Sequence, residues 1–373
     1  MTEWRKVKLG DMLLVKKGDY ITKKEAKEGI YPVILGGKEP AYYIDRYNHT
    51  GKAIVISRSG ASAGYVSYWN EPIFVTDGFL IEPKDNVTFE FLYYTLKSKQ
   101  RLLHSSQKGA AIPHVTPALI NDIDALLPSF PIQRRIAEVL SRYDALIENY
   151  QRQIKLLEEA AQRLYKEWFV DLRFPGHQST PIINNLPQGW EKKTVSMLGE
   201  YLNGFAFKPS DWQETGKPII KIKEMGNGVT AETPRNNGNR VPEKYLIKAG
   251  DLLFSWSATL MVVVWTGEEG WLNQHLFKVT PAEGIGREFL LQSIANAIAE
   301  FSNLTTGSTM KHIQRNKLDQ VFVNTPPPEI MEKYNNLAES IRTQIINKSV
   351  QIRNLSEARD RLLPKLMSAE IEV

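Results

Sequence analysis

The sequence of 373 residues contains no cysteine. This absence excludes disulfide bonds, catalysis by a thiolate and zinc sites with cysteine ligands, and it fits a reducing cytoplasm. No run approaches the ~18 apolar residues that span a bilayer, and Met1–Lys6 lacks the apolar core of a signal peptide. We therefore expect a cytoplasmic protein with no contact with a membrane.

Catalytic motifs are also missing. The sequence has no Gly-x-x-x-x-Gly-Lys phosphate loop, and its six histidines never reach the His-Glu-x-x-His spacing of a zinc hydrolase. The stretch Asn324–Pro327 differs from the Asn-Pro-Pro-Tyr motif of amino-methyltransferases by an inserted threonine and a missing aromatic residue, and it suits the start of a helix better. We expect this chain to hold no catalytic residue, no metal and no cofactor.

Charge of either sign is only weakly in excess. The formal net charge is +5, with 42% hydrophobic and 24% charged residues, which is ordinary for a globular protein. The chain is long enough for two or three domains, each with its own core. A mild positive excess permits nucleic-acid binding without demanding it, because a free-standing basic domain shows a much stronger bias.

The sequence does contain an internal repeat, at a spacing of about 198 residues. Toward the start of each copy the spacing shrinks, which indicates loops of different length. A duplicated scaffold with divergent loops can present two different recognition surfaces, whereas the alternative is an old duplication with no present symmetry of function. The clearest matches are Glu90–Leu92 with Glu288–Leu290, His114 with His312, and Trp4 with Trp190.

The pattern of apolar residues and turns divides the chain into four segments, at residues 1–128, 129–173, 174–325 and 326–373. The first segment also holds a helix-like stretch, Glu90–Leu103, and Asn227–Asn239 in the third is predicted to be a long surface loop. Short β-rich stretches alternate with glycine-rich turns in the first and third segments, at Ala53–Ser57, Pro72–Val75, Pro218–Ile222, Asp251–Ser255 and Leu260–Val264.

The second and fourth segments have helical periodicity. Apolar residues recur every ~3.6 positions from Ile132 to Trp168 with no glycine or proline between them, which predicts one helix over residues 132–170, ~57 Å long. A similar stripe runs from Ile330 to Leu362 and is predicted to end at Pro364. Antiparallel packing of the two helices would relate the copies by an approximate two-fold axis. We expect an α+β protein, with two mixed α/β domains joined by an intramolecular coiled coil.

The loops of the two globular segments hold the residue types that read DNA. Arginine and lysine donate to guanine or phosphate, asparagine pairs with adenine, and hydroxyls position phosphates. Polar loops occur on any protein, so each residue alone is weak evidence. The candidates in the first copy are Lys23, Lys24, Lys38, Tyr42, Arg58, Ser59, Ser62, Lys108 and His114, and those in the second are Lys208, Arg235, Asn236, Arg240, Trp256, Ser257, Thr309, Lys311, His312 and Arg315.

Three stretches make the whole chain resemble the specificity subunit of type I restriction–modification systems. They are the opening from Trp4 to Asp11 with its echo Leu186–Glu191, the segment Gly109–Val115 with its echo, and the start of the first long helix, Leu127–Ala137. The second helix start, Pro328–Lys333, departs from the pattern because it lacks the Gln-Arg-Arg of the first.

The resemblance implies that each globular segment is a target-recognition domain for one half of a split site in double-stranded DNA. The paired helices would set the spacer and dock two methyltransferase subunits, which carry S-adenosylmethionine and methylate N6 of adenine. A motor-nuclease subunit would join for cleavage, and Gln133, Arg134 and Arg135 would contact a partner. The alternative is a coiled-coil scaffold whose globular domains bind proteins rather than DNA. A self-contained enzyme such as a nuclease is disfavoured, because the sequence lacks the metal and cofactor motifs that such an enzyme needs.

Overall fold

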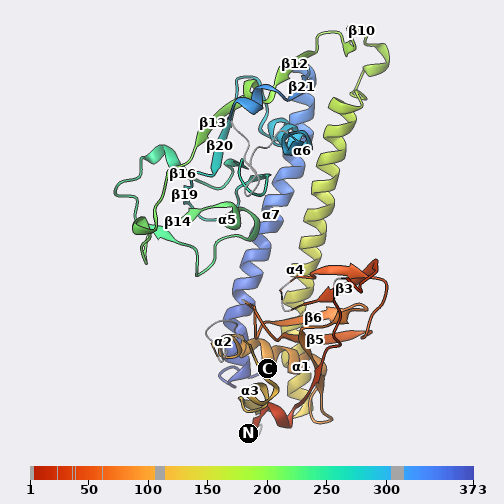
Figure 1. Cartoon of the computed structure of the whole chain (residues 1–373), viewed down its shortest axis with the longest axis vertical. Helices are drawn as coiled ribbons and strands as arrows, with labels where there is room; N and C mark the ends of the chain where they lie inside the picture. The colour runs from red at the N-terminus through yellow and green to blue at the C-terminus, as the bar shows by residue number, and fades with distance from the viewer. Residues whose placement is uncertain are drawn as a thin grey trace. The chain divides into compact units, whose positions relative to one another are not determined.

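The computed structural model describes residues 4–22, 24–35, 37, 39–60, 62–105, 114–303 and 315–373. The chain forms two compact units. The first comprises Met1–Glu148 with Arg353–Val373, and the second comprises Asn149–Ile352. Each unit therefore contains one globular part and portions of both long helices, α4 (Phe130–Tyr165) and α7 (Pro328–Met367) (Figure 1).

The globular part of the first unit is built on three small sheets. β5 lies inside the largest sheet and is apolar along its length because both of its faces are covered: Ile54 and Ile56 join the main core, and Ala53 and Val55 join a smaller cluster. The sheets have the strand orders β2 (Leu13–Lys17), β8 (Gly78–Pro83), β5 (Lys52–Ser57), β6 (Val66–Asn70); β4 (Tyr42–Ile44), β3 (Glu28–Ile34), β7 (Phe74–Val75); and β1 (Arg5–Lys8), β9 (Asp124–Leu127).

The second unit repeats this topology with different loops. Its strands β14 and β19 pair in parallel, as β3 and β7 do in the first unit, whereas β16 and the short helix α5 (Ile222–Asn227) are additions. The strand orders are β13 (Gly199–Asn203), β20 (Leu276–Pro281), β17 (Leu252–Ser255), β18 (Met261–Val264); β15 (Arg235–Asn236), β14 (Lys217–Ile220), β19 (Gly270–Leu272), β16 (Leu246–Ile247); and β12 (Glu191–Thr194), β21 (Phe322–Thr325). A small hairpin, β10 (Ile182–Ile183) with β11 (Leu186–Pro187), precedes them.

The repeated Glu-Phe-Leu sequence lies on a helix that covers the β2–β8–β5–β6 sheet in the first unit and the equivalent β13–β20–β17–β18 sheet in the second. Phe91 and Leu92 on α1 (Phe89–Ser98) are fully buried, and so are Phe289 and Leu290 on α6 (Arg287–Asn303). The repeated phenylalanine and leucine are therefore conserved between the two copies as core residues. The prediction of one helix over Glu90–Leu103 is wrong in detail, because Lys99 leaves helical geometry and a separate helix, α2 (Gln100–Ser105), follows; α3 (Pro117–Asn121) completes the set.

The two long helices form as the periodicity predicts. α4 is 36 residues long and continues through a π-helical turn at Lys166–Val170, and α7 is 40 residues long. The prediction that Pro364 ends the second helix is wrong, since α7 continues to Met367. A proline costs a helix its amide donor and crowds the preceding turn. Here that last turn also buries Leu363 and Leu366 in the core of the first unit, which favours its continuation.

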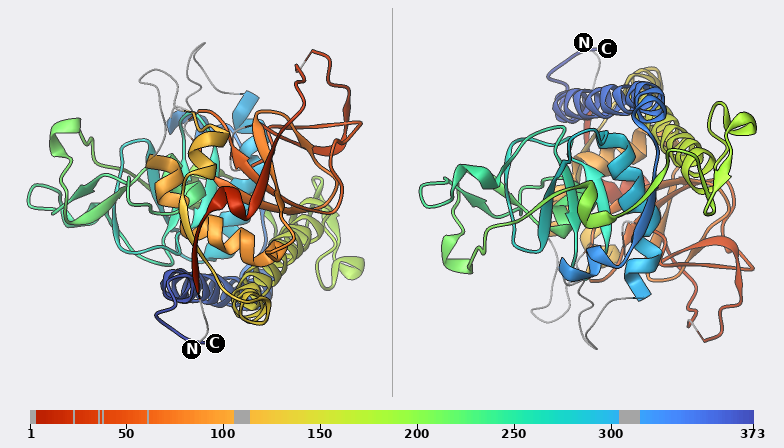
Figure 2. Two further views of the ribbon diagram at one scale, coloured as in Figure 1. Left: turned by 90° about the horizontal axis from the view of Figure 1, so that it is seen from below. Right: turned by 90° about the horizontal axis from the view of Figure 1, so that it is seen from above.

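The long helices pack against each other antiparallel, as their contacts in each unit show. In the first unit Arg359 of α7 forms an ion pair with Asp144 of α4. In the second unit Lys348 lies over the ring of Tyr150, and the ring centroids of Tyr334 and Trp168 are 5.8 Å apart. Residue numbers therefore rise along α4 as they fall along α7, and Figures 1 and 2 both show the helices side by side. The predicted α+β architecture with paired antiparallel helices is confirmed.

Each core is completed by the last helical turns of the other repeat. Leu363 and Leu366, from the end of α7, are buried with residues of β-strands and of α4 in the first unit. Trp168 and Phe169, from the helix that ends the first repeat, are buried in the core of the second unit. Burial of each such side chain contributes about 1.5–3 kcal/mol to stability. Each core therefore depends on side chains that belong to the other repeat.

The chain has no helix among its described residues that is both long enough and apolar enough to cross a membrane.

Candidate functional site

In the first unit, three strands meet at one edge of the four-stranded sheet. β2 and β5 end there and β8 begins there, with Lys17 opposite Phe79 and Ser57 opposite Gly78. Just beyond the last paired residues, the backbone amide of Arg58 donates to the carbonyl oxygen of Asp77 at 3.2 Å. We call Lys17, Arg58, Ser59 and Asp77 the first polar edge.

The side chains of Arg58 and Asp77 in the first polar edge form a partly exposed donor–acceptor pair. The Nη1 atom of Arg58 lies 3.7 Å from Oδ1 of Asp77, and the Ser59 hydroxyl donates to Oδ2 of the same carboxylate. The side chains of Arg58 and Asp77 are 44% and 27% exposed. Both groups are therefore reachable from solvent, while the serine fixes the carboxylate.

His114 lies at the same place. It forms an isolated β-bridge with Ser59, and the amide of the next residue, Val115, donates to the carbonyl oxygen of Arg58 at 2.9 Å. A concave surface there is lined by Lys17, Arg58 and His114 together with apolar neighbours. The structure thus brings together three of the predicted residues, Arg58, Ser59 and His114.

The second unit has an equivalent edge in the same register. Asn203 lies opposite Phe277, Ser255 lies opposite Leu276, and the amide of Trp256 donates to the carbonyl oxygen of His275 at 3.4 Å. Trp256 therefore occupies the place of Arg58, Ser257 that of Ser59, His275 that of Asp77, and Asn203 that of Lys17. We call these four residues the second polar edge.

The chemistry of the second polar edge is different. The Nε1 atom of Trp256 donates to Oδ1 of Asn203 at 3.1 Å, and the rings of Trp256 and His275 are 5.6 Å apart. An indole, an imidazole and an amide thus replace the ion pair and the lysine of the first polar edge. The two units present the same backbone frame with two different sets of side chains.

Both edges depend on a glycine that follows the first strand. A Cβ atom at Gly18 would overlap the carbonyl oxygen of Val75, and one at Gly204 would overlap that of Asn273. Only glycine permits this close approach of two backbone segments. Sequence reasoning missed Gly204, Asp77, Asn203 and His275. The repeat spacing of about 198 residues, which pairs Asp77 with His275, was the signal that could have found two of them.

The other predicted residues of the first unit lie apart from Arg58 and Asp77. Lys24 is exposed in the loop before β3, Tyr42 is half-buried on β4 against a small apolar cluster, and Ser62 is half-buried in the turn after β5. No hydrogen bond or ion pair in the described part of the chain joins them to Arg58 or Asp77. The candidates Lys23, Lys38 and Lys108 lie outside the described residues.

In the second unit, Arg235 and Asn236 stabilise the β14–β15 pair. Arg235 donates to the carbonyl oxygen of Gly216 and forms an ion pair with Glu268, and the buried Asn236 amide bonds the backbone of Asp211 and Gly238. The predicted long loop 227–239 is therefore wrong in detail, since it contains β15 and the end of α5.

The remaining candidates of the second unit differ in accessibility. Ser257 is only 2% exposed, so its hydroxyl cannot reach a partner without a rearrangement. Lys208, Arg240 and Arg315 are exposed cations. Thr309, Lys311 and His312 lie outside the described residues.

The three residues predicted to contact a partner have different surroundings. Gln133 is 1% exposed: its Oε1 accepts from the amide of Thr88, and its Nε2 donates to the carbonyl oxygens of Asn86 and Pro128. This amide therefore fixes the start of α1 beside that of α4. Arg134 and Arg135 are exposed, and Arg135 donates to the carbonyl oxygen of Val373.

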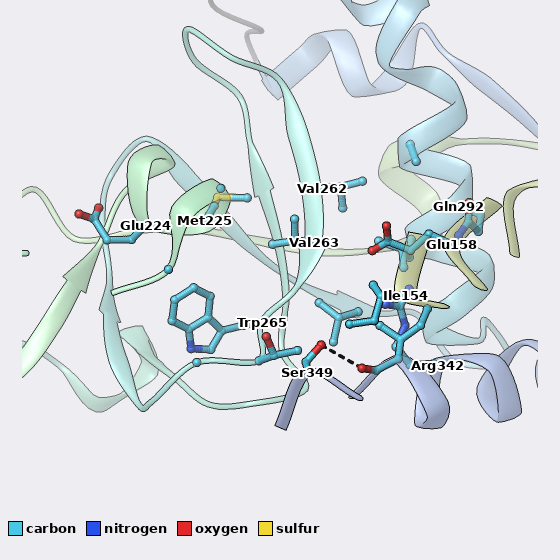
Figure 3. Close-up of a pocket in the computed structure, with 18 of the residues that line it drawn as sticks. Ile154, Glu158, Glu224, Met225, Val262, Val263, Trp265, Gln292, Arg342 and Ser349 are labelled. Carbon is cyan, nitrogen blue, oxygen red and sulfur yellow. Dashed lines mark hydrogen bonds between the residues drawn. The ribbon is translucent and has the colours of Figure 1, made fainter. Parts of the chain in front are cut away.

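A cavity of about 460 Å³ lies in the second unit between α4, α7 and the strand β18 (Figure 3). Its lining includes Glu158, Gln292, Arg342 and apolar side chains. Burial raises the pKa of Glu158, and the positive charge of Arg342 partly opposes this shift. Arg342 itself is paired with Glu288 through Nε, at 3.0 Å. No nucleophile–base arrangement is formed by these lining residues.

Metal chemistry also has no candidate here. Among the described residues, no group of three or more His, Asp or Glu side chains is placed to hold a metal ion. Arg342 of this cavity instead connects α7 with α6 through Glu288, as Tyr94 connects α1 with α4 in the first unit, where its hydroxyl donates to Asp144. The two polar edges are therefore the more informative sites.

The fold and the paired edges define a duplicated α+β protein. The family described as "Type I restriction modification DNA specificity domain" matches residues 1–159 and 187–348, and the chain belongs to this family. It is the specificity subunit of a type I restriction–modification system, and such subunits are the non-catalytic components of those enzymes. The two separate matches agree with the internal repeat.

Similar proteins span most of the chain. The type I restriction enzyme MjaIX specificity subunit of Methanocaldococcus jannaschii is 27% identical over an alignment of 345 residues that covers 86% of this chain and 78% of that protein. The HindI specificity subunit of Haemophilus influenzae is 24% identical over 370 residues, covering 79% of this chain and 80% of that protein. The crystal structure of the S subunit from M. genitalium shares the fold, with a TM-score of 0.59, 18% identity, and coverage of 98% of this chain and 96% of that one.

Proposed function

We propose that this chain directs a type I complex to a bipartite DNA site and that each globular part reads one half of it. The recognition domains are then residues 1–128 and 174–325, and the helical segments are 129–173 and 326–373. The observation that carries the proposal is the pair of polar edges, which share one backbone frame but differ in side chains. Two copies of one scaffold with different readers fit a site with two different halves.

The long helices supply the second part of the proposed function. α4 and α7 hold extended, regular surfaces of 36 and 40 residues, long enough to separate two half-sites and to dock two methyltransferase subunits. Those subunits carry S-adenosylmethionine and the adenine N6 chemistry, and a motor-nuclease subunit joins for cleavage. Arg134 and Arg135, exposed at the start of α4, are the candidate partner contacts on this chain.

The weak net charge of +5 fits this division of labour. Phosphate contacts dominate the affinity of proteins for DNA, and in a complex several subunits share them. The side chains at the polar edges then need to supply discrimination between bases rather than most of the affinity.

The test is to produce the chain with its cognate methyltransferase subunit and to map methylated adenines on a DNA library. We expect one split motif with a fixed spacer, and no methylation by the chain alone. Methylation by the purified chain alone would contradict the proposal. A complex that enriches no bipartite sequence from random duplexes would instead favour the scaffold that binds proteins through its globular parts.

A further inference from the structure

We propose that Arg58 and Asp77 read one G·C base pair in the first half-site, and that no equivalent contact exists in the second. This inference rests on the proposed function, because it names the base pair that one of the two edges recognises. It concerns residues of the first polar edge, of which Asp77 carries no sequence signal of its own beyond the repeat.

The pair matches the major-groove edge of G·C in its order of donors and acceptors. Guanine presents two acceptors, N7 and O6, and the adjacent cytosine presents the N4 amino donor. The guanidinium of Arg58 supplies donors, and the carboxylate of Asp77, 3.7 Å away, supplies an acceptor beside them. One side chain can therefore bond guanine while the other bonds the paired cytosine.

The donors of Arg58 are available. The separation of 3.7 Å between Nη1 and Oδ1 is too long for a good hydrogen bond, and among the described residues no other group bonds the Arg58 guanidinium, so its N–H groups are available to a base. The Arg58 side chain is also 44% exposed. The opposite charges attract each other, but the ion pair does not use up the hydrogen-bonding capacity of the guanidinium and the carboxylate.

The acceptor is held in place before DNA arrives. The Ser59 hydroxyl donates to the Asp77 carboxylate, and the backbone of Asp77 is tied to that of Arg58. Fixing a reader in its bound geometry lowers the ordering cost of recognition. The remaining oxygen of the carboxylate, Oδ1, is the one that faces Arg58.

Guanine fits the pair better than adenine does. Adenine has a single major-groove acceptor, N7, beside its N6 amino donor. A forked guanidinium over adenine would place one N–H group against another donor, whereas guanine accepts both of its bonds. The geometry therefore favours G·C over A·T at this position.

The second polar edge cannot make this contact. Trp256 stands in place of the arginine, and its single donor, Nε1, already bonds Asn203. His275 stands in place of the aspartate and packs against the indole. No side chain at these four positions carries the forked donor or the carboxylate, so the requirement for this base pair belongs to the first half-site alone.

The experiment uses the complex of the full chain with its methyltransferase subunit and a duplex library randomised in both half-sites. The variants are Arg58→Ala and Arg58→Gln. For the wild type we expect a G·C pair in the first half-site. Arg58→Ala should reduce the preference for it by roughly ten- to a hundredfold, the value of one bidentate base contact. Arg58→Gln should shift the preference toward A·T, since glutamine pairs bidentately with adenine.

Two further variants serve as controls. Lys16→Ala removes a cation from β2, on the face of that strand opposite to Lys17, where it pairs with Glu82, and should leave both half-sites unchanged. Trp256→Ala should alter only the second half-site. The unchanged half-site in each variant also reports that the protein is folded.

The outcomes separate this inference from the proposed function. A wild-type complex with no split motif contradicts the proposed function itself. A split motif that survives Arg58→Ala and Arg58→Gln without change, or a first half-site with no G·C pair, contradicts only the inference. Uniform weakening across all sequences would show that Arg58 contacts phosphate and would overturn it as well.

Discussion

Arg342 on α7 and Glu288 on α6 form an ion pair in the core of the second unit, with Nε 3.0 Å from Oε2. Their side chains are 9% and 3% exposed. Arg287 approaches the same carboxylate and also pairs with Glu339 of α7. Because Phe289, the next residue of α6, is fully buried in the core, this network fixes the globular part of the second unit on the long helix.

Removing one partner of this pair should destabilise the second unit strongly. Arg342→Met leaves the buried Glu288 carboxylate with only Arg287, whose Nε is 3.4 Å away, and should cost about 3–5 kcal/mol. Urea denaturation should show the loss. Arg361→Met, which breaks an exposed pair with Glu357 one turn away on the same helix, should cost less than about 1 kcal/mol. If Glu288→Gln added to Arg342→Met recovers none of the stability, the interaction of the two charges is not the cause.

Leu366 should be essential to the core of the first unit. It is 1% exposed, and Leu366→Ala should cost about 2–5 kcal/mol through the cavity it creates. Limited proteolysis should then cut within residues 1–148 before it cuts the second unit. Leu156→Ala, at a leucine of α4 that is 64% exposed, is the matched control and should change little. Equal protection of both units in the Leu366 variant would contradict the assignment of this turn to the first core.

Stability should depend on pH through Glu158. Burial raises the pKa of this carboxyl in the folded protein above its ordinary value of 4.5. The folded state therefore binds the proton more tightly than the unfolded state does. The stability that this proton contributes is lost as the pH rises through the raised pKa. Glu158→Gln should have a higher Tm than the wild type at pH 7, and the difference should vanish near pH 4, where both carry a neutral side chain. Glu159→Gln corrects for the change in net charge, and an equal gain there would contradict the argument.

Gly18→Ala and Gly204→Ala should each damage one polar edge. The added Cβ would overlap the carbonyl oxygen of Val75 or Asn273, so the backbone must move apart. Gly18→Ala should weaken discrimination in the first half-site and Gly204→Ala in the second, as measured by selection from randomised duplexes. Gly226→Ala in α5 is the control, because its Cβ meets only the end of Met261 at 3.9 Å. Equal effects of the first two variants on both half-sites would contradict the pairing of edges with half-sites.

Lengthening both long helices by one turn should lengthen the unread spacer of the DNA site. An insertion of about four residues after Glu148 in α4 and after Ile352 in α7 adds ~6 Å, which corresponds to about one to two base pairs at 3.4 Å each. These points lie at the boundaries of the compact units, so contacts inside each unit are kept. Methylation mapping gives the spacer directly. An insertion in α4 alone breaks the match between the helices and should reduce activity, whereas an unchanged spacer after the double insertion would refute the proposal that the helices set it.

Much of the architecture follows from local pattern. The 3.6-residue stripe from Ile132 to Trp168 has no helix breaker, so a long helix with one apolar face is its only low-energy solution. The apolar run at residues 53–57 forms the central strand β5 for the same kind of reason. Local pattern failed where tertiary packing overrode it, as at Pro364, whose turn continues as a helix while Leu363 and Leu366 are buried.

The candidate site was predicted less completely. Arg58, Ser59 and His114 have residue types suited to DNA and lie together. Asn236, predicted to bind DNA, and Gln133, predicted to contact a partner, also have suitable types, but their amides form hydrogen bonds inside the fold. Residue type alone cannot separate these cases, because the folded backbone decides whether a polar side chain lies at the surface or is buried inside the protein.

The sequence by itself determined the duplication, the two long helices, the absence of catalytic motifs and the family, since periodicity, composition and motifs are properties of the chain read in order. Only the tertiary structure decided which residues meet. Lys17, Arg58 and Asp77 are far apart in sequence and come together because β2, β5 and β8 are neighbours in one sheet. The tertiary structure also decided that each core includes the last helical turns of the other repeat. Burial of apolar surface stabilises a core regardless of which repeat supplies the buried segment.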